Sequence, residues 1–461
     1  MTKRTAVVAL LLTLASCAHY APNLPLQQHP DRSYGYRFSR FEPAGSDDET
    51  FVILTFSGGG TRAAALAYGV MQELARTKIH GGTQSLLDEV DLISSVSGGS
   101  FTSMAYALRD KTPFAQFETD FLRQNVQKAL VRSALNPLNW LRLLSPHFSR
   151  IDLATEYYDQ YVFHRATFAD LAASPKRPFH VVNATEMDLG SRFEFTQEQF
   201  DPICSDLQQM TVGRAVAASS AFPILLTPVT LKNFAGRCEY AEPQWVSSAM
   251  EDSSVNPSRF HTALDLRAYL DAKRQYVQLM DGGVSDNIGL RGPMRALSSG
   301  DPELSLVRLM NNGRIKRVAV IVVDAGTEGD IKLDAHEALP SIKDVLLTVS
   351  GAPMGNYSFD TIEQLRKSIE EWNRDAKTVR QCREMIAETC PNATLPEPDE
   401  EITFYRTVIT FASLPLSERH GFYEMGTNYG LTNAQIDALL AVGPRLMKES
   451  KDFGKLVKEL E

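Results

Sequence analysis

The sequence predicts an α/β fold with a mainly parallel central sheet, because a strand, a tight turn and a helix follow one another twice within about sixty residues. Residues 51–56 are a continuous apolar run that ends abruptly at Ser-Gly-Gly-Gly, as expected of a buried strand that enters a turn. Leu66, Val70 and Leu74 then recur at helical spacing. The run 90–93, a Ser/Gly turn and a second helical pattern repeat this order.

Three further apolar runs supply the rest of the predicted sheet. They lie at 179–184, 276–280 and 318–323. The last is rich in valine, and β-branched residues favour the pleated, buried setting of a strand. We expect all of these strands to lie in one buried parallel sheet.

Helices are expected between and after these strands. Residues 112–175 have amphipathic helical character, whereas 231–275 have the composition of an irregular insertion. Beyond residue 326 the pattern favours helices at 342–349 and 361–372, followed by a charged helical stretch that reaches the C-terminus. We expect that stretch to pack on the sheet or to cover a pocket.

Length and charge exclude several classes of protein. A chain of 461 residues with 43% hydrophobic content can bury a large core, so intrinsic disorder is a poor description of it. The formal net charge of −9 argues against a general nucleic-acid binder, which needs a basic face. Five cysteines are too few for a disulfide scaffold, and their odd number asks for one to be explained separately.

The N-terminus has the layout of a secretion signal. Lys3 and Arg4 precede the apolar run 6–15, which is about half the length that a membrane-spanning helix requires. Leu-Ala-Ser-Cys follows and resembles the lipobox of bacterial lipoproteins, which implies removal of 1–16 and acylation of Cys17. By the same resemblance, Ala18 points to the outer membrane. An ordinary signal peptide with a chance cysteine is the alternative.

Residues 17–50 are then expected to be a lipidated N-terminus and tether, because they are rich in proline and show no apolar periodicity. Acyl chains on Cys17 would attach the protein to the membrane. The four other cysteines would lie in an oxidising compartment, which favours disulfides. Sequential pairing is the simplest of three connectivities, and a zinc site is disfavoured because no C-x-x-C spacing is present. These cysteines are Cys204, Cys238, Cys382 and Cys390.

The first motif with chemical potential is the glycine loop Ser-Gly-Gly-Gly-Thr-Arg at 57–62, between a strand and a helix. Glycines permit a sharp turn and leave N–H groups open at a helix N-terminus, where an anion can bind. The spacing fits neither a P-loop nor a dinucleotide fingerprint. A tight turn without further role is the plain alternative.

Ser-Val-Ser-Gly-Gly at 95–99 is the second motif. It resembles the nucleophile elbow G-x-S-x-G, in which a strained turn between strand and helix exposes a serine hydroxyl. Ser95 takes the place of the first glycine and is still small. An ordinary Ser/Gly loop is the competing interpretation.

The third motif is Asp281-Gly-Gly, directly after the predicted strand 276–280. An aspartate at a strand end, followed by glycines that allow close backbone approach, suits a group that orients or deprotonates a partner. An Asx turn is equally compatible. Ligands bind at the carboxyl ends of strands in open parallel sheets, so three motifs in that position raise the expectation of a site.

Together, and in this order, the three motifs resemble the patatin-like phospholipases, acyl hydrolases with a Ser-Asp dyad. A fourth segment, Ala-Ala-Ser-Ser-Ala-Phe-Pro at 217–223, resembles the family's Ala-Ser-x-Ala-x-Pro run. The resemblance covers about 51–295 and implies a three-layer sandwich with a mainly parallel sheet. Residues 296–461 would complete the sheet with the strand 318–323 and add a helical C-terminal cap.

The resemblance also implies roles for individual residues. Ser97 would attack an ester carbonyl while Asp281 accepts its proton. Gly58, Gly59 and Gly60 would form the oxyanion hole, and Arg62 would support that loop or meet a phosphate headgroup. Membrane lipid or a lipid-derived ester is the implied substrate. The implied chemistry requires no metal or cofactor, and the sequence has no calcium loop or zinc motif. The segments 113–140 and 342–372 are expected to set pocket depth.

Two alternatives remain open in the sequence. A Ser-Asp-His triad of the α/β-hydrolase type would take His336 or His420 as its base. A lipoprotein that binds lipid or a partner protein without turnover is the other, although such proteins usually lose the nucleophile or the oxyanion loop, and this chain keeps both.

Overall fold

The computed structural model of the protein describes residues 19–20, 22–41, 49–223, 225–271, 273–299, 315–327, 337, 339–389 and 402–461. Within this part of the chain the central sheet has eight strands in the order β12-β11-β2-β5-β6-β10-β9, with β7 paired to β6. Their bounds in that order are Thr403–Thr410, Arg317–Asp324, Thr50–Phe56, Val90–Val96, Phe179–Glu186, Tyr276–Asp281, Val229–Lys232 and, for β7, Arg192–Glu194.

The predicted sheet is confirmed in its strands and corrected in one direction. The five strands from β12 to β6 are all parallel to their neighbours. β10 runs antiparallel to both β6 and β9, so the expectation of a wholly parallel set fails there. Val277 and Leu279 are buried and alternate with partly exposed residues, a period-two pattern that an antiparallel strand near a sheet edge tolerates.

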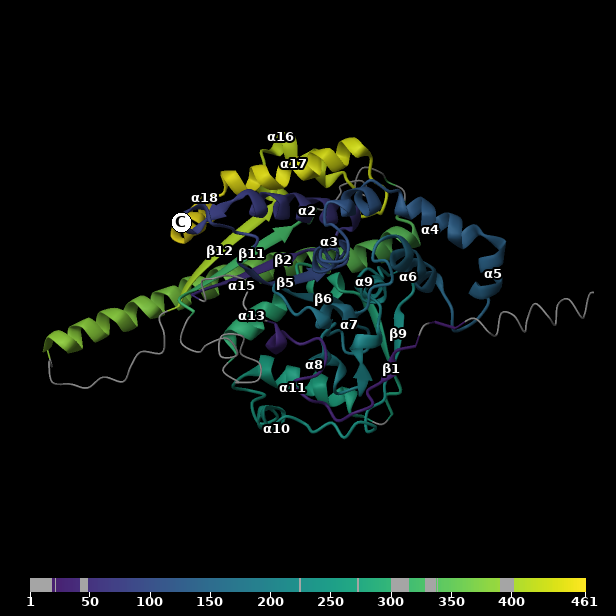
Figure 1. Ribbon diagram of the computed structural model, residues 1–461, viewed down its shortest axis with the longest axis horizontal. Helices are drawn as coiled ribbons and strands as arrows, with labels where there is room; N and C mark the ends of the chain where they lie inside the picture. The colour runs from purple at the N-terminus through teal and green to yellow at the C-terminus, as the bar shows by residue number, and fades with distance from the viewer. Residues whose placement is uncertain are drawn as a thin grey trace, which may run out of the picture.

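Helices on both faces explain why the central strands carry no polar alternation. Every residue of β2 and β5 is buried, which requires cover on both sides of the sheet. α2 and α17 lie above the sheet in Figure 1, and α15 runs on the other side of it. This is the three-layer α/β arrangement that was expected. The bounds of these helices are Gly60–Arg76 for α2, Asn433–Glu449 for α17 and Ile342–Thr389 for α15.

The remaining helices complete the layers and the outer surface. They are α3 (Gly98–Ala107), α4 (Val126–Leu135), α5 (Pro137–Leu143), α6 (Arg150–Tyr161), α7 (Phe168–Ala173), α8 (Gln197–Phe200), α9 (Val212–Ser219), α10 (Gln244–Ala249), α11 (Pro257–Tyr269), α12 (Gly283–Asp286), α13 (Arg291–Ser298), α16 (Leu416–Tyr423) and α18 (Lys451–Leu460). In the described ranges, none of the helices combines the length and apolar character that crossing a bilayer requires. α10 and α11 fall within 231–275, so that segment is more regular than its composition suggested.

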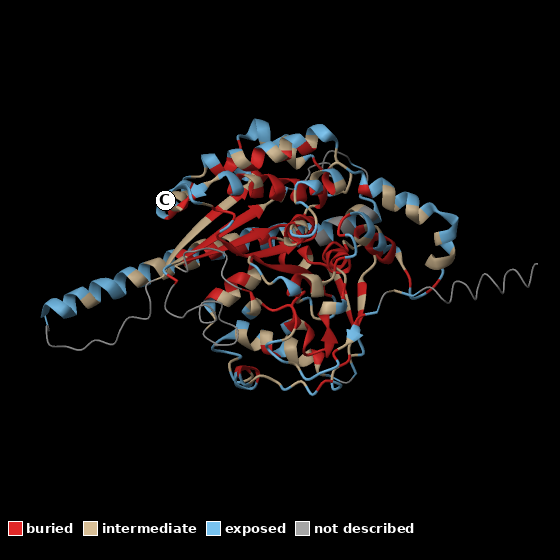
Figure 2. Ribbon diagram, in the orientation of Figure 1, coloured by how far each residue is buried: buried red, intermediate tan, exposed pale blue. Residues whose placement is uncertain are grey.

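α15 corrects a second expectation. The two helices predicted at 342–349 and 361–372 are parts of one helix of 48 residues that continues through Pro353. Figure 2 shows its C-terminal end projecting from the body as an exposed rod. Leu365 and Ile369 are buried on the middle of the helix, so packing against the body holds the helix where it crosses the sheet.

The segment expected as a tether is packed against the domain over 22–41. β1 (Leu24–Pro25) pairs with β8 (Ser205–Asp206). Tyr36 is only 1% exposed and stacks on Phe179 at 4.6 Å between ring centroids. Burial of aromatic side chains stabilises the packing of this segment on the domain, although the segment is rich in proline. The expected tether is therefore shorter than 17–50.

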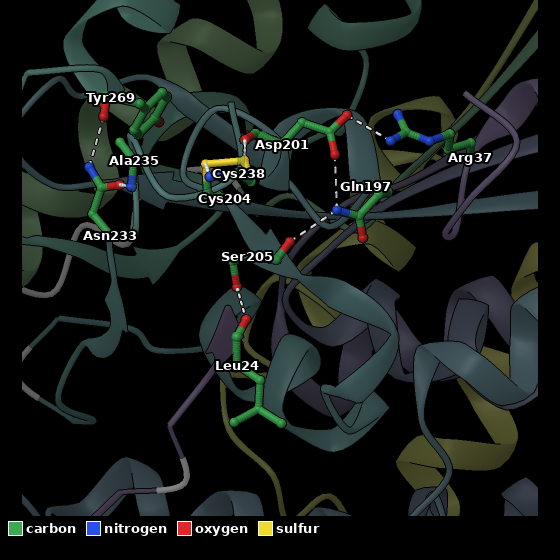
Figure 3. Close-up of a disulfide and its surroundings, with 10 residues drawn as sticks. All are labelled: Leu24, Arg37, Gln197, Asp201, Cys204, Ser205, Asn233, Ala235, Cys238 and Tyr269. Carbon is green, nitrogen blue, oxygen red and sulfur yellow. Dashed lines mark hydrogen bonds and ion pairs between the residues drawn. A yellow bond between two sulfur atoms is a disulfide. The ribbon is translucent and has the colours of Figure 1, made fainter. Parts of the chain in front are cut away.

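A disulfide joins Cys204 to Cys238, with Cα atoms 5.5 Å apart (Figure 3). The Cys204 carbonyl accepts a hydrogen bond from the Leu26 amide at 2.8 Å, and nearby Arg37 pairs with Asp201 at 2.7 Å. The bond closes a span of 34 residues. By lowering the chain entropy of the unfolded state, a cross-link of this span stabilises the fold by about 4 kcal/mol. It therefore fastens the N-terminal segment and the 233–239 loop to the same part of the domain.

The second sequential pair is not formed. Cys382 is a free, exposed thiol on α15, and Cys390 lies outside the described residues. β3 (Lys78–Ile79) and β4 (Gln84–Ser85) form a small separate hairpin.

Candidate active site

The turn between β5 and α3 has the geometry of a nucleophile elbow. Ser97 has φ 48° and ψ −118°, a backbone conformation that L-residues rarely adopt and that occurs at functional turns. A Cβ on Gly98 would lie 2.1 Å from the Gly60 carbonyl oxygen, so only glycine fits there. Ser95 is fully buried and donates to the Val181 carbonyl at 3.1 Å, which explains how a serine replaces the first glycine of the motif.

Ser97 and Asp281 meet although they are 184 residues apart. The Ser97 hydroxyl donates to Asp281 Oδ2 at 2.8 Å, and the Gly283 amide donates to Asp281 Oδ1 at 2.8 Å. The two side chains belong to residues that are 4% and 3% exposed. The structure thus brings together the two residues that the sequence singled out on separate turns.

The antiparallel course of β10 is what delivers Asp281 to Ser97. Val96 pairs with Asn183 on β6, and Asp281 pairs with the next residue, Ala184. β10 approaches from beyond the carboxyl end of β6 and ends level with the carboxyl end of β5. The expectation that Ser97 and Asp281 lie at the same edge of the sheet is correct, but it assumed that both follow parallel strands. β10 is antiparallel, and it is the register of the strands that brings the two turns together.

The segment 219–221 connects the two turns. The Ser97 amide donates a hydrogen bond to the Ser219 hydroxyl at 2.8 Å. The Ser219 carbonyl accepts from the Gly282 amide at 3.0 Å, and the Ala221 carbonyl accepts from the Asp281 amide at 3.0 Å. The Ala-Ser motif of the sequence therefore supplies the bridge that keeps Ser97 and Asp281 in register, a role its residues alone did not reveal.

Burial raises the pKa of Asp281 to about 6, and the hydrogen bonds from the Gly283 amide and the Ser97 hydroxyl oppose that rise. A carboxylate near its ordinary pKa is a weak base toward a hydroxyl. Desolvation makes it a better acceptor, while at pH 7 most of it stays ionised. The site therefore holds a partly desolvated carboxylate beside the Ser97 hydroxyl.

The glycine loop corrects the expected set of oxyanion donors. The Gly58 amide donates to the Asn287 carbonyl at 2.8 Å, so it is not available to a substrate. Gly59 and Gly60 have φ of 141° and 60° and begin α2, and their amides have no acceptor within the described residues. At a helix N-terminus such amides carry partial positive charge. Two amides of this loop, and not three, are therefore without an acceptor among the described residues.

Arg62 supports the loop and does not face solvent. Its Nε donates to the Ala325 carbonyl at 2.9 Å, Nη1 donates to the Met425 carbonyl, and Nη2 donates to Thr427 Oγ1 at 3.3 Å. The residue is 3% exposed, and burial lowers the pKa of its guanidinium to about 10. Its donors hold the C-terminal segment against the glycine loop, which leaves little capacity for a phosphate headgroup.

The site opens into a cavity of about 500 Å³, called the site cavity below. Ser97, Asp281, Gly58, Gly59 and Arg62 line it. One wall comes from α15, as expected for 342–372, whereas no residue of 113–140 takes part. The α15 residues are Gly351, Met354, Gly355, Ser358, Phe359, Ile362 and Glu363. The fold places these residues opposite the glycine loop.

Sequence reasoning missed several groups that complete the site. Tyr429 lies on the C-terminal segment with its ring 5.7 Å from that of Phe101. Burial raises the pKa of its phenol, and Asp281, Ser220 and Ser97 lie near enough to influence that pKa. Val408 and Thr410, on the edge strand β12, also line the cavity. No motif surrounds these residues, so no signal in the sequence could have found them.

The histidines considered for a triad have different outcomes. His420 lies on α16, where it pairs with Glu424 at 3.1 Å, and its side chain is 77% exposed. It does not line the site cavity. His336 lies outside the described residues. A base role for His420 is therefore wrong, because its ring is turned to solvent on another element.

The fold and the site together define an α/β protein with a nucleophile elbow. Comparison of the chain with models of protein families identifies the family. The model of the patatin-like phospholipase family matches residues 54–294, more than half of the chain. The protein belongs to the patatin-like phospholipase family, a family of lipid acyl hydrolases. No curated protein sequence matches the chain significantly.

Several solved structures are similar at low identity. Human GIVD cytosolic phospholipase A2 is 13% identical, with 100% of this chain and 67% of that chain covered and a TM-score of 0.46. Its complex with methyl gamma-linolenyl fluorophosphonate is 12% identical, covering 100% and 64%, with a TM-score of 0.38. VipD from Legionella pneumophila is 12% identical, covering 91% and 71%, with a TM-score of 0.27. The chain spans about two thirds of the human protein, and likenesses at this level carry no information on activity.

Proposed function

We propose that the protein is a serine acyl hydrolase that cleaves a carboxylic ester of a lipid, with Ser97 as nucleophile and Asp281 as general base. The observation that carries the proposal is the 2.8 Å hydrogen bond between Ser97 Oγ and Asp281 Oδ2, on a strained elbow that lines a cavity. Nucleophile and base within hydrogen-bond reach are the signature of covalent catalysis.

The proposed reaction has two steps. Ser97 Oγ attacks the ester carbonyl carbon while its proton passes to Asp281 Oδ2. The tetrahedral oxyanion accepts hydrogen bonds from the Gly59 and Gly60 amides, each worth about 3 kcal/mol. Collapse expels the alcohol, which takes the proton from Asp281. Water then attacks the acyl-enzyme with Asp281 again as base, and Ser97 regains its proton as the fatty acid leaves.

The walls of the site cavity favour an acyl chain beside Ser97. Met354, Phe359 and Ile362 of α15 and Val408 of β12 present apolar surface to it, and apolar walls with few polar groups suit a hydrocarbon ligand. Phospholipid, lysophospholipid and neutral ester all contain the required ester. The committed donors of Arg62 mean that a phosphate headgroup would have to be recognised by other residues.

Attachment to a bacterial envelope membrane through acylated Cys17 is part of the proposal and rests on the leader pattern alone. More than one acyl chain on Cys17 would give stable anchoring. An outer-membrane position follows from Ala18 by the same resemblance. Metabolic labelling with an alkyne fatty acid should tag the reference protein, and Cys17→Ala should remove the label.

A fluorophosphonate probe and lipid-product analysis test the catalytic proposal together. The probe should modify Ser97 and leave Ser97→Ala unlabelled, and both Ser97→Ala and Asp281→Asn should lose at least about 10³-fold in kcat. His420→Ala is the matched control and should keep full activity. Hydrolysis that survives Ser97→Ala, or folded protein that never labels, would mean a binding protein without turnover or a different nucleophile.

A further inference from the structure

Residues 121–151 differ in charge from the rest of the chain. They contain five Lys or Arg and no Asp or Glu, in a protein whose net charge is −9. These residues build α4, α5 and the turns that flank them. In Figure 1 the two helices extend from one side of the body, and Figure 2 shows them mostly exposed. Arg123 pairs with Glu118 and Asp437, and Arg142 pairs with Glu156. The positive charge that this lobe presents therefore depends on its other cations.

Large apolar side chains share this lobe. In α4 only Val126 is buried, and α5 has no buried residue. Five exposed apolar residues define what we call the α4–α5 face: Val131 (51% exposed), Leu135 (63%), Leu138 (74%), Trp140 (53%) and Leu144 (69%). Several large exposed apolar side chains on two neighbouring helices favour an interaction surface over isolated surface residues.

Cations and apolar groups are interleaved on α4. Lys128, Val131, Arg132 and Leu135 follow one another at helical spacing, so they lie along one side of the helix. Neither Lys128 nor Arg132 forms an ion pair with any residue that the structure describes. Basic residues beside Leu and Trp are the composition of a helix that lies in a membrane interface, whereas the buried centres of protein interfaces are depleted of lysine.

The N-terminal end of the described chain lies at this lobe. The Tyr20 amide donates to the His147 carbonyl at 2.7 Å, and the rings of His19 and His147 stack with centroids 4.9 Å apart. Cys17 precedes His19 by two residues, which span at most about 7 Å. An acyl chain on Cys17 would therefore enter a membrane next to the end of α5.

The site cavity is a neighbour of the same lobe. The Gln127 amide donates to the Tyr429 carbonyl at 2.9 Å. Lys128 and Arg132 line a shallow hollow of about 540 Å³ that ends at Asn428, and the adjacent Thr427 lines the site cavity. The Asn428 carbonyl accepts from the Thr61 amide of the glycine loop at 2.9 Å. A surface bound by α4 would lie close to the proposed nucleophile.

We propose that the α4–α5 face, with Lys128 and Arg132, docks on a lipid bilayer that contains anionic lipid. Trp140 and the leucines enter the headgroup region while the two cations meet lipid phosphates. The docking rests on the proposed function and adds the surface through which the protein contacts its lipid. Acylation of Cys17 enters the argument only through the position of Cys17 near this face. Docking and acylation then act on one side of the molecule, as two weak attachments that reinforce each other.

Vesicle flotation tests the inference with the full chain carrying Cys17→Ala, so that acylation cannot hold the protein on the membrane. The leader is common to every variant and cancels in the comparison. Vesicles of phosphatidylcholine with phosphatidylglycerol should bind the reference at least about tenfold better than phosphatidylcholine alone. The double variant Lys128→Glu/Arg132→Glu should remove that preference, and Leu138→Ser/Leu144→Ser should weaken binding about tenfold on both.

Leu416→Ser is the matched control, because Leu416 is 76% exposed on α16 and belongs to another element. It should bind vesicles like the reference. Trp140 is also a reporter: vesicles should shift its emission to the blue, and Trp140→Phe should remove the shift, since Trp245 is buried and Trp372 packs on Phe404.

Docking and catalysis can fail separately. All face variants should hydrolyse a soluble short-chain ester at the reference rate, and Ser97→Ala should float with vesicles without hydrolysing anything. Face variants that float like the reference would overturn the inference. So would a dimer that the same substitutions dissociate in the absence of vesicles, because the face would then serve a second copy of the chain.

Discussion

Two pairs of glycines belong to different parts of the site, and they differ in the space around them. Gly98 and Gly282 directly follow Ser97 and Asp281, whereas Gly351 and Gly355 line the site cavity from α15. A Cβ on Gly98 or Gly282 would lie 2.1 or 2.2 Å from a backbone oxygen. Gly351 and Gly355, on the α15 wall, have nothing within 4 Å of an added Cβ. Backbone beside Ser97 and Asp281 is packed against backbone, while the α15 wall has unfilled room at its glycines.

If the proposed function holds, the difference assigns the chemistry to one part of the site and the choice of substrate to the other. Close approach of backbones fixes where Ser97 and Asp281 stand, so that side of the cavity cannot vary without losing its geometry. The α15 wall is a helix surface whose side chains can change in size without moving the backbone. We expect variation in acyl-chain preference to come from that wall, and substitutions on the two sides can test this.

The largest effect is expected from Gly98→Ala. The added methyl group would collide with the Gly60 carbonyl and force the elbow away from the glycine loop. A displacement of about 1 Å at the reacting atoms costs on the order of 10² in rate, so kcat on a soluble ester should fall at least that far. Gly355→Ala is the control. Equal activities of the two variants would mean that close packing at the elbow has no role.

Arg62→Met should have the next largest effect and should act on stability. It removes donors to the Ala325 and Met425 carbonyls and leaves buried acceptors without partners, at a cost of about 3 kcal/mol. Urea unfolding measures the loss. The C-terminal segment should also become accessible to protease. An unchanged midpoint would show that other contacts hold that segment on the loop.

Asp281→Asn should stabilise the protein at neutral pH while it abolishes activity. Burial raises the pKa of Asp281 to about 6, above the value of about 3.9 in an unfolded chain. The carboxyl therefore contributes stability below about pH 4 that is lost as the pH rises through 6. At pH 7.5 the variant should gain about 3 kcal/mol in urea unfolding, and the gain should shrink on acidification.

The activity of the reference protein should follow the same group. Because Asp281 must be ionised to accept the serine proton, kcat/KM should rise with pH through about 6. A rate that is constant from pH 5 to pH 8 would contradict a general-base role for this carboxyl.

The smallest effect belongs to the open wall. Gly355→Ala should raise stability by about 0.5–1 kcal/mol, since alanine loses less entropy in a helix and meets no atoms here. Its activity on short esters should match the reference. Gly355→Leu should keep that activity and discriminate several-fold against long acyl chains, as judged by kcat/KM over an ester series. Loss of short-ester activity in either variant would contradict the division between the two sides.

Sequence patterns located the chemistry better than the walls around it. The turns at Gly58, Ser97 and Asp281 follow apolar strands and carry glycines that only tight backbone contacts require, so local composition exposes them. β12 was not predicted, because it is a half-buried edge strand whose sequence is not a continuous apolar run. The direction of β10 and the hydrogen bond of the Gly58 amide could not be predicted, because both depend on partners that are distant in the chain.

By itself the sequence determined the α/β class, the order of the central strands' turns, the elbow, the Asp-Gly-Gly turn and the family, because each depends on short-range spacing and small residues. Only the tertiary structure decided that β10 is antiparallel, that two glycine amides remain open, that Arg62 is committed to carbonyls, and that α15 walls the cavity. It also placed the N-terminal segment beside α5. These features arise from hydrogen bonds and packing between residues far apart in the chain, and no local pattern encodes which distant partner a group will meet.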